Sequence, residues 1–202
     1  AGADIFDWKQ RLYGLTNAPY RLRAVANFGE PLVPAASYAV MDALLSLPGV
    51  DAAAGWMPWI GASLLLTPEA VRTPLLLSQG RSLWEVSRVK EPVSLAYQLT
   101  PEKGAALPSF WPAAPPALGT RLNLHRFRED RFEVSGVGAG WVFVAEPRYP
   151  GWTTVLASPD GEKRVFPVSA LSAFQKVQTP DGPWTLRWRY EPLPWHLGLL
   201  FT

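Results

Sequence analysis

The segment Arg131-Phe132-Glu133-Val134-Ser135-Gly136 alternates apolar and polar side chains, and this alternation decides the fold class. Successive side chains of a β-strand point to opposite faces, so Phe132 and Val134 share one face and the residues between them share the other. Residues 121–128 also have the composition of a strand, and Glu129-Asp130 between the two segments is a candidate hairpin turn. The pattern predicts an antiparallel hairpin with one buried face.

Further strands are expected on both sides of this hairpin. Segments rich in β-branched and aromatic residues recur at roughly the 8–12-residue spacing of a β-sandwich. They span residues 63–67, 83–89, 93–99, 141–146, 153–158, 163–168, 174–178 and 184–191. Gly161 after Asp160, and Gly182 after Asp181, supply the positive φ that tight turns need. The predicted fold class is mostly β, with a β-sandwich or jelly-roll-like core.

The helical signals lie in the first sixty residues. Between Pro34 and Leu47, apolar side chains recur every three or four positions, which indicates an amphipathic helix. We expect residues 1–60 to form one or two short helices packed on the core, and residues 61–202 to form the sandwich. Residues 104–120 are rich in proline and predict a loop or linker within one compact unit.

The composition agrees with a folded β protein. Of the 202 residues, 48% are hydrophobic and 18% charged, while 21 prolines and 10 tryptophans disfavour a helical bundle. The absence of cysteine excludes disulfides and thiolate catalysis. No run reaches the ~18–20 apolar residues that a membrane-spanning helix needs. The apolar run that starts at Leu197 is either a terminal core element or the first turn of a membrane helix, and the sequence leaves both open.

No pattern in the sequence assembles a catalytic site. The two histidines, His125 and His196, have no Gly-x-Ser-x-Gly elbow beside them, which disfavours a Ser/His/Asp set, and they show no metal-ligand spacing. Gly136, Gly138 and Gly140 lie between two strands, so they predict a turn rather than a phosphate loop. We assign no catalytic residue, metal or cofactor. A carboxylate pair for glycoside hydrolysis stays open, since such pairs join residues distant in sequence.

A group of basic residues marks residues 121–131. It comprises Arg121, His125, Arg126, Arg128 and Arg131. The formal net charge of the chain is +2, and Glu129, Asp130 and Glu133 dilute this group. A solvated strand edge is therefore the favoured interpretation, and we expect no nucleic-acid partner. A face lying near anionic lipid head groups is an intermediate option.

The motif Tyr149-Pro150-Gly151-Trp152 is the most distinctive short sequence in the chain. Proline fixes φ and glycine adopts turn conformations closed to other residues, so the motif is first an architectural turn whose aromatic pair closes one end of a sandwich. In the alternative, an exposed indole stacks on the apolar face of a sugar. We name Trp111, Tyr149 and Trp152 as candidate ligand-binding residues, and Trp111 is the tryptophan most expected to be exposed.

An ordered series of markers gives a family resemblance. Tyr149-Pro150-Gly151-Trp152 is followed by Asp160-Gly161 and then by Tyr190-x-Pro192. Over about residues 120–202 this resembles the C-terminal region of the YfhO-like bacterial membrane proteins, and residues 10–100 resemble the family more loosely. There, Tyr-Pro-Gly-Trp follows a strand, an Asp-Gly turn comes next, and Tyr-x-Pro precedes a membrane helix. We treat these eight positions as structural markers.

The resemblance implies an extracytoplasmic domain of a multi-pass bacterial membrane protein related to C-type glycosyltransferases, which use polyprenyl-phosphate sugars. The catalytic acid of those enzymes lies in an early loop that no residue here matches, so the resemblance carries over no catalytic role. The implied partners are the membrane-embedded remainder of its own chain and a glycan or polyprenyl-phosphate sugar. The alternatives are a free-standing carbohydrate-binding or carbohydrate-active protein, or a domain that only holds partner subunits.

Overall fold

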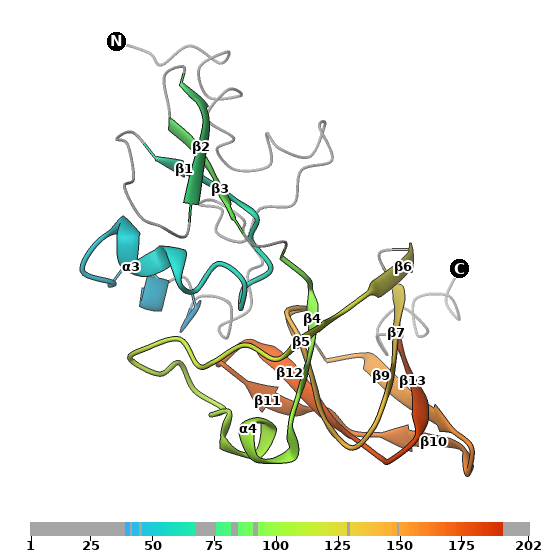
Figure 1. Ribbon diagram of the computed structural model, residues 1–202. Helices are drawn as coiled ribbons and strands as arrows, with labels where there is room; N and C mark the ends of the chain where they lie inside the picture. Colours follow the sequence, from blue (N-terminus) through green and yellow to red (C-terminus); the bar gives the residue numbers. More distant parts are fainter. Residues whose placement is uncertain are drawn as a thin grey trace, which may run out of the picture.

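The structure is a computed structural model that describes residues 39–40, 42–44, 46–67, 76–81, 85–90, 93–128, 130–148 and 150–191. Residues 39–40 and 42–44 are helical, and the elements that follow are shown in Figure 1. They are α3 (Val50–Ala54), β1 (Leu64–Thr67), β2 (Leu76–Arg81), β3 (Glu85–Val89), β4 (Ala96–Leu99), α4 (Pro101–Ala106), β5 (Thr120–Leu122), β6 (Leu124–Arg128), β7 (Arg131–Val137), β8 (Gly140–Val144), β9 (Trp152–Ser158), β10 (Gly161–Val165), β11 (Val168–Ala170), β12 (Phe174–Thr179) and β13 (Pro183–Tyr190).

Ten of these strands form two stacked antiparallel sheets. The strand orders are β10-β9-β13-β7-β6 in one sheet and β11-β12-β8-β4-β5 in the other. The space between the sheets is filled by buried apolar side chains from both inner faces: Ala96, Phe132, Val134, Val142, Val144, Leu156, Val177, Trp184, Leu186 and Trp188. Phe132 and Val134 point inward, as their alternation with polar residues requires. The predicted class, a mostly β sandwich with short helices packed on it, is confirmed.

The sheet that contains β8 is buried on both faces. Its outer face carries Tyr97 and Phe143, and the Trp59 ring covers both, with ring centroids 6.3 and 4.9 Å apart. The helical residues Val40 and Leu44 join the same cluster. Because both faces are covered, β8 is an almost continuous apolar run instead of an alternating one. The described part of the predicted 34–47 helix therefore packs on the core as expected.

The predicted loop at residues 104–120 is helical at its start, because α4 extends to Ala106. Thr100 caps the N-terminus of α4 by accepting a hydrogen bond from the Lys103 amide. At the other end, buried Lys176 donates from Nζ to the carbonyl oxygens of Gly104, at 2.6 Å, and Leu107, at 2.7 Å. Burial lowers the pKa of Lys176 below its ordinary 10.5. Residues 107–119 then run over the sheet without regular structure, as predicted.

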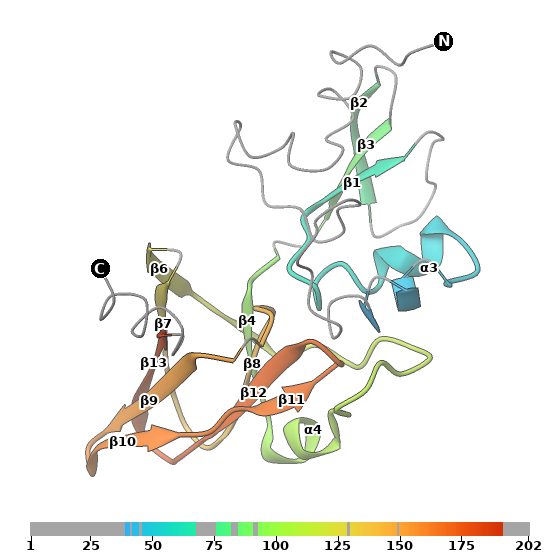
Figure 2. The same ribbon diagram turned by 180° about the vertical axis from the view of Figure 1, so that it is seen from behind.

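β1, β3 and β2 form a sheet of their own, in that order, rather than joining the sandwich. Figures 1 and 2 show this small sheet apart from the stacked strands, from opposite sides. Ala54 of α3, Met57 and Val89 form the small core beneath it. Among the described residues, the sandwich is therefore built from residues 96–190, whereas the expected range was 61–202; residues 192–202 lie outside the described part of the chain. β2 was not predicted, because a register shift between Ser78 and Gly80 interrupts its alternation.

The glycine-rich turn between β7 and β8 crosses from one sheet to the other. Gly138 has φ +91°, and a Cβ on Gly140 would lie 2.3 Å from the Leu99 carbonyl oxygen. Three side chains donate to the Gly138 carbonyl oxygen: Gln98 Nε2 at 3.2 Å, Thr179 Oγ1 at 3.3 Å and Trp184 Nε1 at 3.0 Å. The turn that the glycines predicted is therefore anchored to both sheets.

Candidate functional site

The Tyr149-Pro150-Gly151-Trp152 motif lies where the chain leaves β8 and enters β9. Gly151 has φ +106°, a conformation that glycine adopts without strain, and its carbonyl oxygen accepts a hydrogen bond from the Glu191 amide at 2.7 Å. Pro150 is exposed, and Trp152 is the first residue of β9. Tyr149 lies outside the described residues. The motif thus forms the turn that directs the chain from one sheet to the other.

The Trp152 ring packs among aromatic side chains at the end of the sandwich. Its centroid lies 5.3 Å from that of Phe132 and 5.2 Å from that of Tyr190. Phe132 in turn stacks on Trp188, with centroids 4.8 Å apart. Trp152 and Tyr190 are half-buried, whereas Phe132 and Trp188 are fully buried. The aromatic residues therefore close this end of the sandwich while two of the rings keep partial access to solvent.

An ion pair joins the two sheets at the same end. Arg126 Nη2 on β6 lies 2.6 Å from Glu146 Oε2, which follows β8, and both side chains are largely buried. The Arg126 guanidinium also lies 5.2 Å from the Phe132 ring centroid, within the range of a cation–π contact. The pair is charge-assisted and therefore stronger than a neutral hydrogen bond. It fixes the separation of the sheets beside Trp152.

Three buried polar atoms at this end have no hydrogen-bond partner within the described part of the chain: Trp152 Nε1, Thr154 Oγ1 and Gln175 Nε2. Thr154 lies opposite Trp188 in the β9–β13 register, and Gln175 Oε1 accepts a hydrogen bond from Trp188 Nε1 at 3.2 Å. Leaving a buried polar group unpaired costs about 1–3 kcal/mol. These atoms are therefore hydrogen-bonding capacity that the fold itself does not use.

We call this group the sandwich-end cluster. It consists of Arg126, Phe132, Glu146, Trp152, Thr154, Gln175, Trp188 and Tyr190. The sequence singled out Trp152 and Tyr190, and it indicated Arg126 only as part of a basic group. The other polar members, Glu146, Thr154 and Gln175, were missed. The sequence pattern could have indicated a buried polar side chain at Gln175, because Gln175 shares the inward face of its strand with apolar Val177. The sequence could likewise have indicated a buried carboxylate at Glu146, because Glu146 directly follows the apolar run that begins in β8.

No family model, no curated protein and no solved structure matched this chain.

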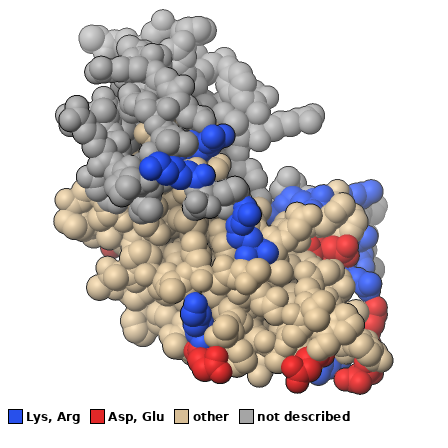
Figure 3. Space-filling view, in the orientation of Figure 1, with Lys and Arg blue, Asp and Glu red and all other residues tan. Residues whose placement is uncertain are grey.

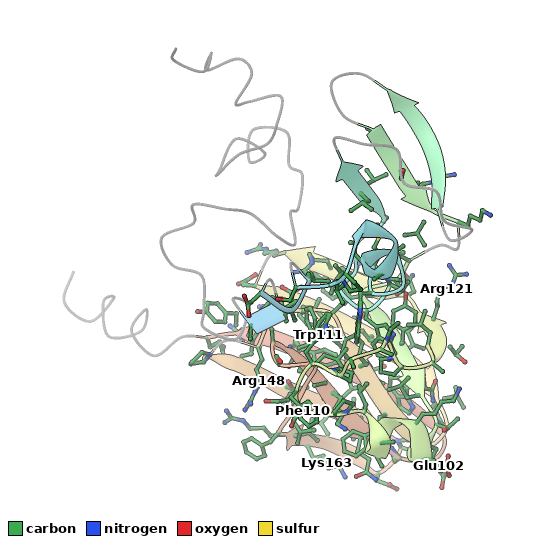
Figure 4. The ribbon with its side chains drawn as sticks, turned by 90° about the vertical axis from the view of Figure 1, so that its left-hand side faces the viewer. Glu102, Phe110, Trp111, Arg121, Arg148 and Lys163 are labelled. Atoms are coloured by element: carbon green, nitrogen blue, oxygen red, sulfur yellow. The ribbon has the colours of Figure 1, made fainter. Side chains whose placement is uncertain are left out.

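Trp111, the other candidate tryptophan, lies on a different face. Its ring centroid is 4.1 Å from that of Trp56, in the cluster on the outer face of the β8 sheet, and Figure 4 shows it close to α3. It is half-buried rather than exposed, and its Nε1 is buried without a partner in the described residues. The exposed ring is its neighbour Phe110, at 68%. The structure therefore does not bring Trp111 together with Trp152.

The remaining structural markers occupy turns and strand ends. Ser158 pairs with Gly161, so Pro159 and Asp160 form the tip of the β9–β10 hairpin, and Gly161 has the expected positive φ, +108°. This tip is at the far end of β9 from Trp152. Asp181-Gly182 instead connects β12 to β13 in the other sheet. Pro192 lies outside the described residues.

Two further observations concern metal sites and membrane spans. Across the described ranges there is no group of three or more His, Cys, Asp or Glu residues able to hold a metal ion. His125 lies on β6 with its ring 4.5 Å from that of Phe127, while His196 is outside the described residues. None of the helices among the described residues has the length and apolarity needed to cross a bilayer.

Proposed function

We propose that this chain is a non-catalytic extracytoplasmic module of a multi-pass bacterial membrane protein of the glycosyltransferase type, and that its sandwich-end cluster binds a glycan. One observation supports the binding role above the others. The half-buried rings of Trp152 and Tyr190 adjoin three buried polar atoms that the described fold leaves unpaired. Apolar surface combined with a few convergent polar groups is the usual make-up of a small-ligand site.

The three polar atoms are buried, so a sugar reaches them only when this end of the sandwich opens, and they then suit its hydroxyl groups. The Trp152 indole N–H and the Gln175 amide N–H are donors, and the Thr154 hydroxyl both donates and accepts. The Arg126–Glu146 pair adds charged groups that form strong hydrogen bonds with hydroxyls. An aromatic ring at the same place offers a flat apolar surface to the C–H face of a pyranose. The cluster thus combines stacking and directional recognition.

The family markers support the module part of the proposal. Gly151 and Gly161 have positive φ at the two ends of β9, and Tyr190 is the last residue of β13. The two glycines thus fall at junctions where a positive φ favours glycine, and Tyr190 falls at a strand end. This is the pattern expected if the markers report a shared architecture, with the chemistry of the parent protein located elsewhere.

The test is a titration of the ¹⁵N-labelled chain with a panel of oligosaccharides and a short-chain polyprenyl-phosphate sugar. We expect a ligand from the panel to shift the Trp152 indole N–H signal, identified by its loss in Trp152→Phe. That variant keeps a ring but removes the donor, so we expect about five- to ten-fold weaker binding with folding intact. Trp111→Phe is the matched control, because Trp111 Nε1 is also buried and has no hydrogen-bond partner among the described residues.

Two outcomes would contradict the binding role. The first is a panel in which no ligand moves the Trp152 signal. The second is an equal loss of binding in Trp152→Phe and Trp111→Phe, which would show that indole N–H groups act through general stability rather than through this site.

A further inference from the structure

Three arginines form one row across the outer face of the β6–β7–β13 sheet. Arg128 is the register partner of Arg131, and Arg131 is the register partner of Arg189. Residues directly opposite each other on neighbouring strands share a face, with Cβ atoms roughly 4.5–5.5 Å apart. The row therefore places three guanidinium-bearing side chains side by side on three adjacent strands.

The row is exposed and only partly neutralised. Arg189 Nε lies 2.8 Å from Glu191 Oε1, while Arg128 and Arg131 form no ion pair within the described residues. Glu129 and Asp130, in the turn between the two strands, are the acidic residues nearest in sequence, and Glu129 lies outside the described residues. Like charges placed directly opposite each other destabilise a sheet. An anion bound at the row would remove that repulsion.

The next row along the same strands has a different character. There His125 faces Glu133, and Glu133 faces Arg187. Arg187 is neutralised twice, because its Nη1 lies 2.7 Å from Glu162 Oε1 and its Nε lies 3.8 Å from Glu133 Oε2. On β6, β7 and β13, excess positive charge is thus concentrated in the row of Arg128, Arg131 and Arg189. In Figure 3, blue atoms gather at the edge where Figure 1 places β6, with one patch of red beside them.

An exposed aromatic ring adjoins the arginine row. Phe127 is 52% exposed and lies at the register shift between Arg126 and Arg128, on the edge strand β6. Its ring contacts His125, with centroids 4.5 Å apart. Basic side chains beside an exposed phenylalanine are the combination that binds the boundary between lipid head groups and acyl chains.

We propose that this edge, consisting of Phe127, Arg128, Arg131 and Arg189, docks on the head groups of anionic phospholipids. A row on an open sheet face matches the flat array of phosphates at a membrane surface better than it matches one small anion in a pocket. Arg189 directly precedes Tyr190, and its register partner Thr153 directly follows Trp152. Docking would therefore hold the sandwich-end cluster close to the membrane, a role separate from glycan binding.

The experiment is co-sedimentation with vesicles of phosphatidylcholine alone and of phosphatidylcholine mixed with phosphatidylglycerol. We expect binding to the mixed vesicles that weakens as salt is raised. A basic residue near an anionic surface contributes roughly five-fold, so Arg128→Gln with Arg131→Gln should lower the partition coefficient about 30-fold. The matched control is Arg164→Gln with Arg187→Gln. Val155 is the register partner of both arginines, so Arg164 continues the row of Arg187 on β10. This control removes the same charge from the neighbouring row and should change binding little.

Equal binding to both kinds of vesicle would overturn the proposal, and so would an equal effect of the two double variants. Binding to an oligonucleotide in place of the vesicles would assign the row to nucleic acid and would also overturn it. None of these three results bears on the titration of the Trp152 signal with oligosaccharides, which is carried out in the absence of vesicles.

Discussion

Replacing Thr154 by valine should stabilise this protein. Thr154 is 1% exposed, points into the sandwich opposite Trp188, and its Oγ1 has no partner within the described residues. Valine keeps the β-branched shape that suits a strand and replaces the hydroxyl by a methyl group. A buried hydroxyl without a hydrogen bond costs about 1–3 kcal/mol in mutational data, so the gain should be at least about 1 kcal/mol.

Urea unfolding followed by tryptophan fluorescence measures this change. We expect a higher midpoint with an unchanged slope, and a melting temperature about 2–4 °C higher per kcal/mol for a chain of this size. The control is Thr179→Val, because Thr179 is also buried but its Oγ1 donates to the Gly138 carbonyl oxygen at 3.3 Å. That variant should lose about 1 kcal/mol. The two threonines are thus expected to respond with opposite signs.

A loss of more than about 0.5 kcal/mol in Thr154→Val would refute the reasoning, since it would mean that the hydroxyl is satisfied in the folded protein. The same result would weaken the proposed glycan site, because the site depends on unused hydrogen-bonding capacity. If the variant is more stable and also binds a panel ligand more weakly, both inferences gain support from one substitution.

Three further predictions concern the charges and the glycine turn. Arg126→Met should cost up to about 3–5 kcal/mol, because it removes the ion-pair partner that lies 2.6 Å from the largely buried Glu146 carboxylate. Changing both Arg126 and Glu146 to methionine should cost less, as a urea double-mutant cycle will show. Thermal unfolding should show a larger loss of stability for Gly140→Ala than for Gly138→Ala. A Cβ at position 140 would lie 2.3 Å from the Leu99 carbonyl oxygen. A Cβ at position 138 would meet no described atom within 4 Å, so that variant suffers only backbone strain of about 1–2 kcal/mol. Burial lowers the pKa of Lys176, so as pH rises the folded state loses the Lys176 proton before the unfolded state does. The free energy of unfolding should therefore rise with pH between the lowered pKa and 10.5. A pH series of urea unfolding should show a smaller slope for Lys176→Met.

The strands were predictable where one face is buried and the other exposed. Residues 131–137 alternate as that arrangement requires, and β7 lies where expected. The prediction of β8 depended on its β-branched and aromatic content, because covering both faces removes the alternation. α4 was missed because Gly104 and the nearby prolines are typical of a loop sequence. Its stability comes partly from Lys176, which is distant in sequence, and no local pattern encodes that contact.

The site was less predictable than the fold. Trp152 and Tyr190 were singled out because their motif residues are unusual, and Gly151 has the positive φ that the predicted turn requires. The Arg126–Glu146 pair could not be found, since its partners belong to different sheets and meet only after the sandwich has closed. The expectation for Trp111 was wrong for a related reason. A proline-rich flank suggested exposure, but Trp56, from a separate helical region, covers the ring.

The double coverage of the β8 sheet has a practical consequence for anyone who shortens this protein. Trp56 and Trp59 precede the first strand, yet they shield Phe143 and Tyr97 at the centre of the chain. A version trimmed to residues 96–190 would keep every described strand of the sandwich, but it would expose the apolar outer face of the β8 sheet to water. Such a trimmed chain should aggregate during expression, so the N-terminal boundary is better set upstream of residue 39.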